Sequence, residues 1–311
     1  MKRVLISLLF AIAVVGYLRA FNKEVYFVSS AYINFDQNSE AISNVIDTSG
    51  KLSLYKVERI KDSLQVAKAN LGGMLMDYKS SDVRDVLFYV HGYGKELVDV
   101  YERALSIEET YDVAVVFFYW PFKNSKGKPS NLMQAKRKIE SSIPSFKAFV
   151  GLAAEVRRSG EFGNVSLLAH SLGNYFLEIY SEEDNSDFYT FDNLILNSAA
   201  VNDKKHSEWL NKIDIQRRIY VLYNKHDFLL KGLQFFTRAR RQLGNSVSHV
   251  ALPSVNYIDM SPLVKFQFPI GNTHSYFTGE VPDNTEQVRG IYSTLIKGKP
   301  IGDYAYFSVK Q

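Results

Sequence analysis

A short turn that joins a buried strand to a helix constrains the fold of this chain more than any other feature. In the stretch VSLLAHSLGN, residues 165–174, strand-forming residues lead into a turn centred on Ser171, and a helical segment follows at once. A turn this sharp needs small residues two positions before and two after its centre, where the chain has Ala169 and Gly173. The pattern is typical of a parallel sheet whose strands are joined by helices.

Similar runs, rich in β-branched and aromatic residues, recur along the chain and alternate with helical stretches. The clearest are Val86–Val90, Val113–Tyr119, Leu194–Leu196 and Ile219–Tyr223. None alternates strictly between polar and apolar residues, as expected of strands that are covered on both faces. We therefore predict an α/β fold with a mostly parallel central sheet covered by helices on both faces.

Two further segments and one helix complete the expected framework. Glu24–Ile33 and Leu52–Ile60 are expected to supply the first strands, with antiparallel pairing left open. Helical spacing predicts a helix with Pro144 in its first turn and an apolar stripe made of Phe146, Phe149, Val150 and Ala153.

The first twenty residues have the layout of a secretory signal peptide. Lys2 and Arg3 precede an apolar run, Val4–Leu18, and Ala20 offers a small residue at a cleavage position. The run is shorter than the roughly 20 residues of a spanning helix, and an uncleaved N-terminal anchor is the alternative. We expect an exported protein, periplasmic or secreted, in which residues 21–311 form a single domain because no repeat or linker divides them.

Charge and cysteine content exclude several classes of protein. The formal net charge of +4 falls to about +1 without Lys2, Arg3 and Arg19, so the remaining chain has no general attraction for nucleic acid. The chain has no cysteine, which excludes disulfides, thiolate metal sites and a cysteine nucleophile. Since no HExxH, EF-hand or glycine-rich phosphate-binding motif is present, we expect neither a metal nor a cofactor.

Ser171 is the candidate nucleophile. The strained turn would hold its hydroxyl exposed above the sheet, and the helix start beside it provides backbone N–H groups. The alternative is an ordinary loop serine or helix N-cap, a common role for serine. The strand before Ser171 and the helix after it favour the nucleophile.

Six sequence pieces, in chain order, resemble the α/β-hydrolase superfamily and, within it, a group of poorly characterised bacterial serine hydrolases. They are VLFYVHGYG, VVFFYWP, VSLLAHSLGN, IYVLYNKHDFLL, NYIDMS and HSYF, and they span residues 86–277. The serine turn is specific to the fold, whereas the WP and HSYF pieces indicate the subgroup. In two departures, Ala169 replaces the first glycine of the turn, and Gly94 stands where the subgroup often has a polar residue. The resemblance implies hydrolase chemistry but no substrate, because the fold hosts many.

The resemblance also implies an oxyanion hole. In this fold one donor is the N–H of the residue after the nucleophile, here Leu172. The second comes from the loop after an early strand, where His91-Gly92 precedes Tyr93, and we assign it to the Tyr93 N–H. The alternative is a glycine-rich turn with a buried, hydrogen-bonded His91.

The triad of this fold runs along the chain as serine, acid and histidine. Asp227 follows the late strand Ile219–Tyr223 and is our candidate acid, with Asp203 after the preceding strand as the alternative. His274, in a turn of the sequence GNTHSY, is the candidate base, with His249 as the alternative.

These residues predict acyl transfer on a small-molecule or lipid-like acyl substrate, most simply a carboxylic ester. A thioesterase, amidase or peptidase would use the same triad, and a non-catalytic binding protein on this scaffold is the alternative of another class. Oligomeric state is left open.

A basic stretch and a pair of phenylalanines are each expected to have a structural role. The basic stretch is expected to be a solvated loop and helix face, although contact with an acidic membrane surface or an anionic substrate is the alternative. Its members are Lys123, Lys126, Lys128, Lys136, Arg137 and Lys138. Phe235-Phe236 is expected to pack in the core, with a lid helix as the alternative.

Overall fold

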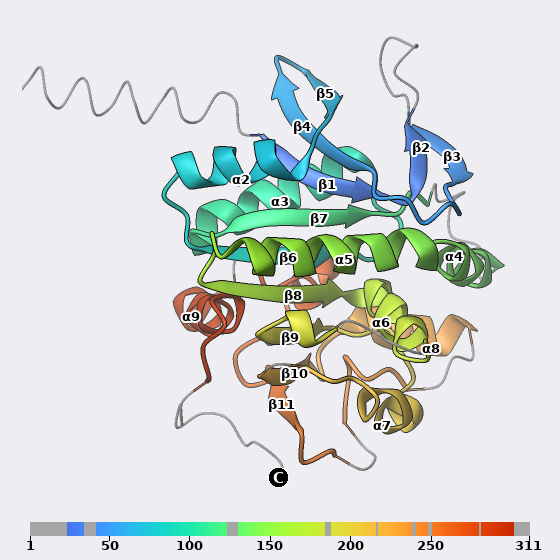
Figure 1. Ribbon diagram of the computed structural model, residues 1–311. Helices are drawn as coiled ribbons and strands as arrows, with labels where there is room; N and C mark the ends of the chain where they lie inside the picture. Colours follow the sequence, from blue (N-terminus) through green and yellow to red (C-terminus); the bar gives the residue numbers. More distant parts are fainter. Residues whose placement is uncertain are drawn as a thin grey trace, which may run out of the picture.

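A nine-stranded sheet organises the chain in the computed structural model (Figure 1). The structure describes residues 24–33, 42–122, 130–183, 188–215, 217–237, 241–247, 251–279 and 281–301. The strands of the sheet are β1 (Val25–Ser29), β4 (Leu54–Ile60), β5 (Ser63–Lys68), β6 (Asp85–Val90), β7 (Ala114–Tyr119), β8 (Asn164–His170), β9 (Asn193–Asn197), β10 (Arg218–Tyr223) and β11 (Val255–Asp259). They lie in the order β11-β10-β9-β8-β6-β7-β1-β4-β5.

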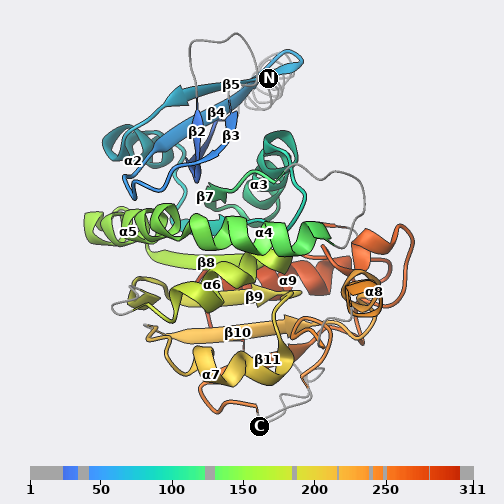
Figure 2. The same cartoon turned by 90° about the vertical axis from the view of Figure 1, so that its right-hand side faces the viewer.

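Most neighbouring strands in this sheet are parallel. Every pair from β11 across to β1 is parallel, whereas β4 is antiparallel to both β1 and β5. Strands β6 to β10 are buried along almost their whole length, which explains why their sequences are mostly continuous apolar runs. The sheet is twisted, since β10 is seen lengthwise in Figure 2 and β7 and β8 in Figure 1.

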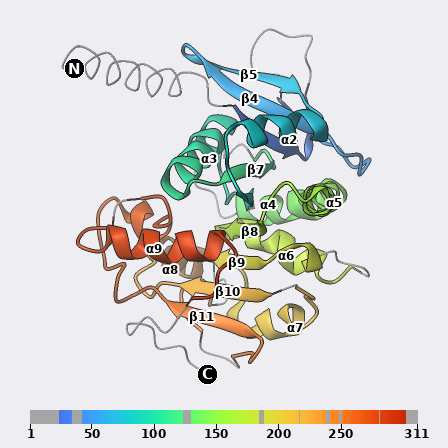
Figure 3. The ribbon, with the colours of Figure 1, turned by 60° about the vertical axis from the view of Figure 1, so that its left-hand side comes forward.

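Helices cover both faces of the sheet, as predicted (Figure 3). One face packs against α3 (Leu97–Tyr111) and α9 (Thr285–Ile296), and the opposite face against α5 (Ile143–Ser159) and α6 (Asn174–Tyr180). The other α-helices of the described residues are α2 (Leu71–Ser80), α4 (Ser130–Ser141), α7 (His206–Leu210) and α8 (Phe228–Thr237). Alternate residues of β6 enter the two cores: Phe88 packs on Phe149 of α5, whereas Tyr89 packs on Phe277.

The predicted helix with Pro144 in its first turn is α5. Its whole apolar stripe is buried, and Pro144 lies where a missing N–H costs no helical bond. Gly160 ends the helix with φ +70°, a left-handed conformation that glycine adopts without strain.

The N-terminal part of the sheet differs from the prediction at its first strand and at β5, which was not predicted. The segment Glu24–Ile33 forms two strands, because the chain leaves the main sheet after Ser29, and β2 (Ala31–Ile33) pairs with β3 (Ile42–Ile46). The predicted leader, residues 1–20, lies outside the described residues. Within the described part of the chain, no helix has the length and apolar character needed to span a membrane.

The fold brings several loops to one edge of the sheet. Strands β6, β8 and β10 are parallel, so the segments after Val90, His170 and Tyr223 all leave from their carboxyl ends. This edge is where open α/β sheets build their sites.

Candidate active site

Ser171 occupies a strained turn between β8 and α6. Its φ is +55°, a left-handed conformation that residues other than glycine seldom adopt. A 3-10 turn, η1 (Ser171–Gly173), separates the strand from α6, so the α-helix begins at Asn174 rather than directly at the serine. The carbonyl of Ser171 accepts a 3.0 Å hydrogen bond from Ala200 N, and the serine is partly exposed.

The loop after β6 lies directly against this turn. A Cβ atom on Gly173 would sit 2.6 Å from the His91 carbonyl oxygen, and one on Gly92 would sit 2.9 Å from Ser171 Cβ. Both distances are shorter than real Cβ contacts, so larger residues would force backbone apart. Glycine at these two positions lets the two loops of the expected oxyanion hole approach each other.

Asn174 holds the turn together and was not identified from the sequence. Its buried Nδ2 atom lies 3.0 Å from both the Ala169 and Ser171 carbonyl oxygens and 3.4 Å from that of Asn197. It thereby connects β8, the turn and β9. A buried amide directly after the turn glycine is the signal that could have identified it.

Asp227 and His274 are hydrogen-bonded at this edge. Asp227 Oδ2 lies 2.6 Å from His274 Nδ1, and both side chains are buried. The other carboxylate oxygen, Oδ1, accepts the N–H of Leu230 at 3.0 Å, so Asp227 also caps the start of α8. Because Nδ1–H donates to the carboxylate, the basic lone pair of a neutral His274 lies on Nε2.

Side-chain hydrogen bonds to backbone carbonyls fix the loop of His274 to the loops of Ser171 and Asp227. Ser198 Oγ donates to the His274 carbonyl at 2.9 Å, two residues before the Ala200 N–H that binds Ser171. Asn224 Nδ2 donates to the Thr273 carbonyl at 3.0 Å. Sequence reasoning missed the roles of Ser198 and Asn224, since both depend on contacts between distant loops.

The alternative acid is part of a different cluster. Asp203 Oδ1 lies 3.9 Å from His206 Nδ1, and His206 Nε2 lies 2.8 Å from the Tyr257 hydroxyl. The alternative base, His249, lies outside the described residues. The geometry therefore pairs Asp227, and not Asp203, with His274.

His91 is buried and links the HGYG loop to the Trp120-Pro121 pair. Trp120 N donates to His91 Nε2 at 3.2 Å, Trp120 Nε1 donates to the His91 carbonyl at 3.0 Å, and the two rings stack with centroids 5.2 Å apart. Because Nε2 accepts a hydrogen bond, the proton is on Nδ1, which lies 2.7 Å from the Gly92 carbonyl.

This bond sets the direction of the next peptide group. In a trans peptide the C=O and N–H bonds point in opposite directions, so a Gly92 carbonyl held by His91 turns the Tyr93 N–H away from it. A buried, hydrogen-bonded His91 was the alternative to an oxyanion donor in this loop. The structure has the buried His91, and its geometry is compatible with the Tyr93 N–H acting as a donor. Leu172, the other expected donor, is buried in η1.

Burial of His91 predicts a loss of stability in acid. Burial lowers the pKa of His91 from 6.5 to about 3, so between these pH values the unfolded chain binds a proton that the folded chain does not. Stability should therefore fall as the pH falls through this window, by about 1.4 kcal/mol per pH unit for one imidazole. In urea unfolding between about pH 4.5 and 6.5, His91→Gln should show a shallower pH dependence than wild type. Equal slopes would show that His91 does not carry the effect.

The basic stretch that begins at Lys123 and the Phe235-Phe236 pair are only partly covered by the described residues. Lys123, Lys126 and Lys128 lie outside them, whereas Arg137 is exposed on α4 and Lys136 Nζ lies 4.3 Å from the ring centroid of Tyr175. The side chains of Phe235-Phe236, within α8, also lie outside the described residues. In the part of the chain that is described, histidine and acidic residues form no group of three or more that could hold a metal ion.

The chain is similar to a protein family and to several solved structures. Residues 66–254 match a family described as "alpha/beta hydrolase of unknown function (DUF900)". Similar solved structures include an uncharacterised protein from Capnocytophaga ochracea (12% identity, TM-score 0.39, covering 90% of this chain and 66% of that one). Another is an acylaminoacyl peptidase from Pyrococcus horikoshii (11% identity, TM-score 0.36, 81% and 47%). The chain thus spans just under two thirds of the first protein and about half of the second. A comparison with curated proteins finds no match.

Proposed function

Because the chain belongs to this alpha/beta hydrolase family, we propose that it is a serine hydrolase in which Ser171, His274 and Asp227 form a catalytic triad. The observation that carries the proposal is the 2.6 Å bond between His274 Nδ1 and Asp227 Oδ2, at the edge of the sheet where Ser171 occupies its strained turn. A buried carboxylate in this position fixes the tautomer of the imidazole and stabilises its protonated form during reaction.

The proposed reaction proceeds through an acyl-enzyme. His274 Nε2 takes the proton of the Ser171 hydroxyl, and the serine oxygen attacks the substrate carbonyl. The N–H groups of Tyr93 and Leu172 stabilise the negative oxygen that forms, and loss of one such donor lowers turnover by about 10²–10³ in other enzymes. His274 then protonates the leaving group, and a water molecule activated by the same imidazole releases the acyl group.

A carboxylic ester is the substrate class we favour, and thioester, amide or peptide bonds are the alternatives for the same triad. A non-catalytic binding protein on this scaffold is the contrary proposal. It conflicts with the presence of the serine in its strained turn together with a buried, hydrogen-bonded His274–Asp227 pair, which has no evident use in binding alone.

Covalent labelling separates these proposals. Wild-type protein should react with a fluorophosphonate probe, and mass spectrometry of the labelled peptide should locate the adduct on Ser171. A panel of p-nitrophenyl esters of increasing acyl length would then reveal turnover and chain-length preference. Absence of both labelling and hydrolysis would favour a binding protein, and labelling at another serine would refute the triad.

A further inference from the structure

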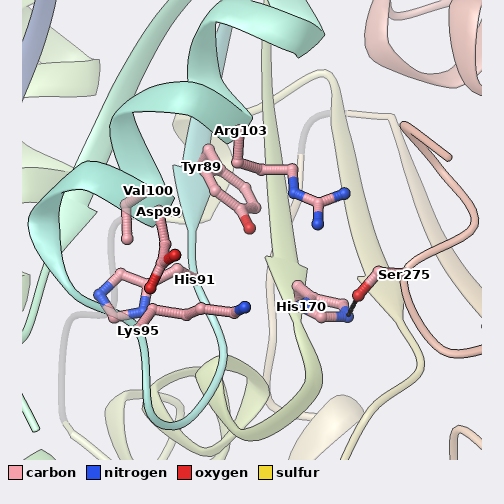
Figure 4. A pocket seen from close by; sticks show the side chains of 8 residues that line it. All are labelled: Tyr89, His91, Lys95, Asp99, Val100, Arg103, His170 and Ser275. Atoms are coloured by element: carbon pink, nitrogen blue, oxygen red, sulfur yellow. Dashed lines mark hydrogen bonds between the residues drawn. The ribbon is translucent and has the colours of Figure 1, made fainter. Parts of the chain in front are cut away.

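A small pocket adjoins the proposed triad (Figure 4). His170 and Ser275, which line it, are the chain neighbours of Ser171 and His274, and His91 of the HGYG loop forms another wall. His170 Nε2 lies 3.3 Å from the His274 carbonyl oxygen, and the two imidazole rings lie 4.7 Å apart. The pocket therefore shares its walls with the proposed reaction centre.

Two cations face this pocket. Figure 4 shows the Lys95 ammonium and the Arg103 guanidinium around the same space as the Tyr89 hydroxyl and the His170 ring. Lys95 precedes α3 and Arg103 lies in its second turn, so one helix positions both. Tyr89 is 3% exposed, and its hydroxyl faces the pocket from β6.

The two cations share the pocket lining with one carboxylate, that of Asp99. Among the described residues, Lys95 and Arg103 have no ion pair with a carboxylate. Arg103 donates one N–H to the Thr278 hydroxyl and lies over the Phe277 ring, which fixes the guanidinium and leaves other N–H groups to face the pocket. Asp99, the acidic residue of the lining, accepts the Glu96 N–H at 3.0 Å and caps α3.

The two cations affect the pKa values of the buried His170 and Tyr89 side chains in the pocket. Burial lowers the pKa of His170 well below its ordinary value, and the charges of His274, Arg103 and Lys95 lower it further. Burial also raises the pKa of Tyr89 to about 12, although the Arg103 charge acts in the opposite direction. His170 is therefore neutral near pH 7, and the two cations Lys95 and Arg103 exceed the one carboxylate of the lining, Asp99.

From this arrangement we infer that the pocket is an anion subsite, which binds a carboxylate or phosphate group carried by the substrate beside its scissile acyl bond. This inference rests on the proposed function and specifies its substrate class as negatively charged acyl compounds. The enclosed space of the pocket is about 10 Å³, roughly that of one water molecule and far below the roughly 300–1,000 Å³ of sites that enclose a whole ligand. In the proposed complex an oxygen of the charged group enters this space while the rest of the substrate lies over Ser171.

The ligand chemistry follows from the donors. Arg103 offers planar paired N–H groups and Lys95 a compact charge, the two common partners of carboxylate and phosphate oxygens. Tyr89 adds a hydroxyl that stays protonated near pH 7. A neutral substrate group placed here would displace water from both cations without replacing its hydrogen bonds.

A matched pair of substrates tests this subsite. Mono-(4-methylumbelliferyl) succinate carries a terminal carboxylate, whereas 4-methylumbelliferyl pentanoate has a similar length and no charge. The wild-type kcat/KM ratio of succinate to pentanoate should exceed one and fall with ionic strength, because salt screens the attraction. Lys95→Gln and Arg103→Gln should each lower this ratio about 10–100-fold, the range of a lost charge-assisted hydrogen bond. Arg158→Gln, which removes an exposed charge from α5, should keep the wild-type ratio.

A binding measurement that does not require turnover keeps this test independent of the proposed chemistry. Titration of the protein with inorganic phosphate and with acetate should give heat in the calorimeter for wild type and lose it in Lys95→Gln and Arg103→Gln. Binding of phosphate alone or of acetate alone would identify the preferred group. Lys95→Arg and Arg103→Lys keep the charge and should partly restore binding.

Each outcome separates the two proposals. Hydrolysis of pentanoate together with a ratio that the Gln variants leave unchanged, and no binding of either anion, would refute the subsite while the serine hydrolase stands. Anion binding that depends on Lys95 and Arg103, without labelling at Ser171, would support the subsite and refute the proposed chemistry.

Discussion

Ser171→Ala is expected to lower kcat for ester hydrolysis by about 10⁶-fold and to abolish fluorophosphonate labelling, because no other group can replace a nucleophilic oxygen. Some rate above that of water, about 10³–10⁴-fold, can persist where binding and oxyanion donors remain. The fold should tolerate the change, since serine already bears the strain of about 1–3 kcal/mol of this left-handed conformation and alanine bears a similar one. Steady-state kinetics with a 4-methylumbelliferyl ester and urea unfolding of the same preparation measure the two effects.

The control for this variant is Ser159→Ala. Ser159 ends α5, is exposed, and its hydroxyl donates to the Val156 carbonyl, so its removal should leave both labelling and turnover unchanged. Ser171→Ala with wild-type turnover would refute the nucleophile and with it the triad.

The sequence predicted the central sheet well because burial on both faces leaves a plain signal. The runs at Val86–Val90 and Ile219–Tyr223 agree with β6 and β10 to within one residue. By contrast, β5 at Ser63–Lys68 is exposed along one side and carries polar residues, so no apolar run marks it. The split of Glu24–Ile33 was also unpredictable, because it depends on a second sheet made with β3.

The site was predictable where it depends on chain order and hidden where it depends on contacts between loops. The order of Ser171, Asp227 and His274 follows the pattern of the fold, and the structure brings the last two into contact. The bonds of Trp120 to His91 and of Asn224 to Thr273 join segments 29 and 49 residues apart. The sequence did not indicate a role for Lys95 and Arg103, because two cations eight positions apart, on a helix and the loop before it, are usually solvated.

Asp227→Asn is expected to lower kcat by about 10⁴-fold, because an amide in this position favours the wrong tautomer of His274 and no longer stabilises its protonated form. The structural cost should be small, since asparagine keeps an oxygen that can accept the Leu230 N–H and is itself a favourable helix cap. A large loss of turnover with nearly unchanged unfolding free energy would therefore identify an electrostatic role, and loss of both together would indicate a role in folding instead.

The same substitution at Asp203, the alternative acid, is the matched comparison. Asp203 is fully buried beside His206, in a cluster that joins α7 to β11 through Tyr257. Asp203→Asn should therefore reduce stability by about 1–3 kcal/mol in urea unfolding, as the loss of a buried polar contact does, and change kcat by no more than a few-fold. If Asp203→Asn instead lost about 10⁴-fold in kcat and Asp227→Asn did not, the 2.6 Å bond between Asp227 and His274 would be structural, and the acid would have to act from the preceding strand in another conformation.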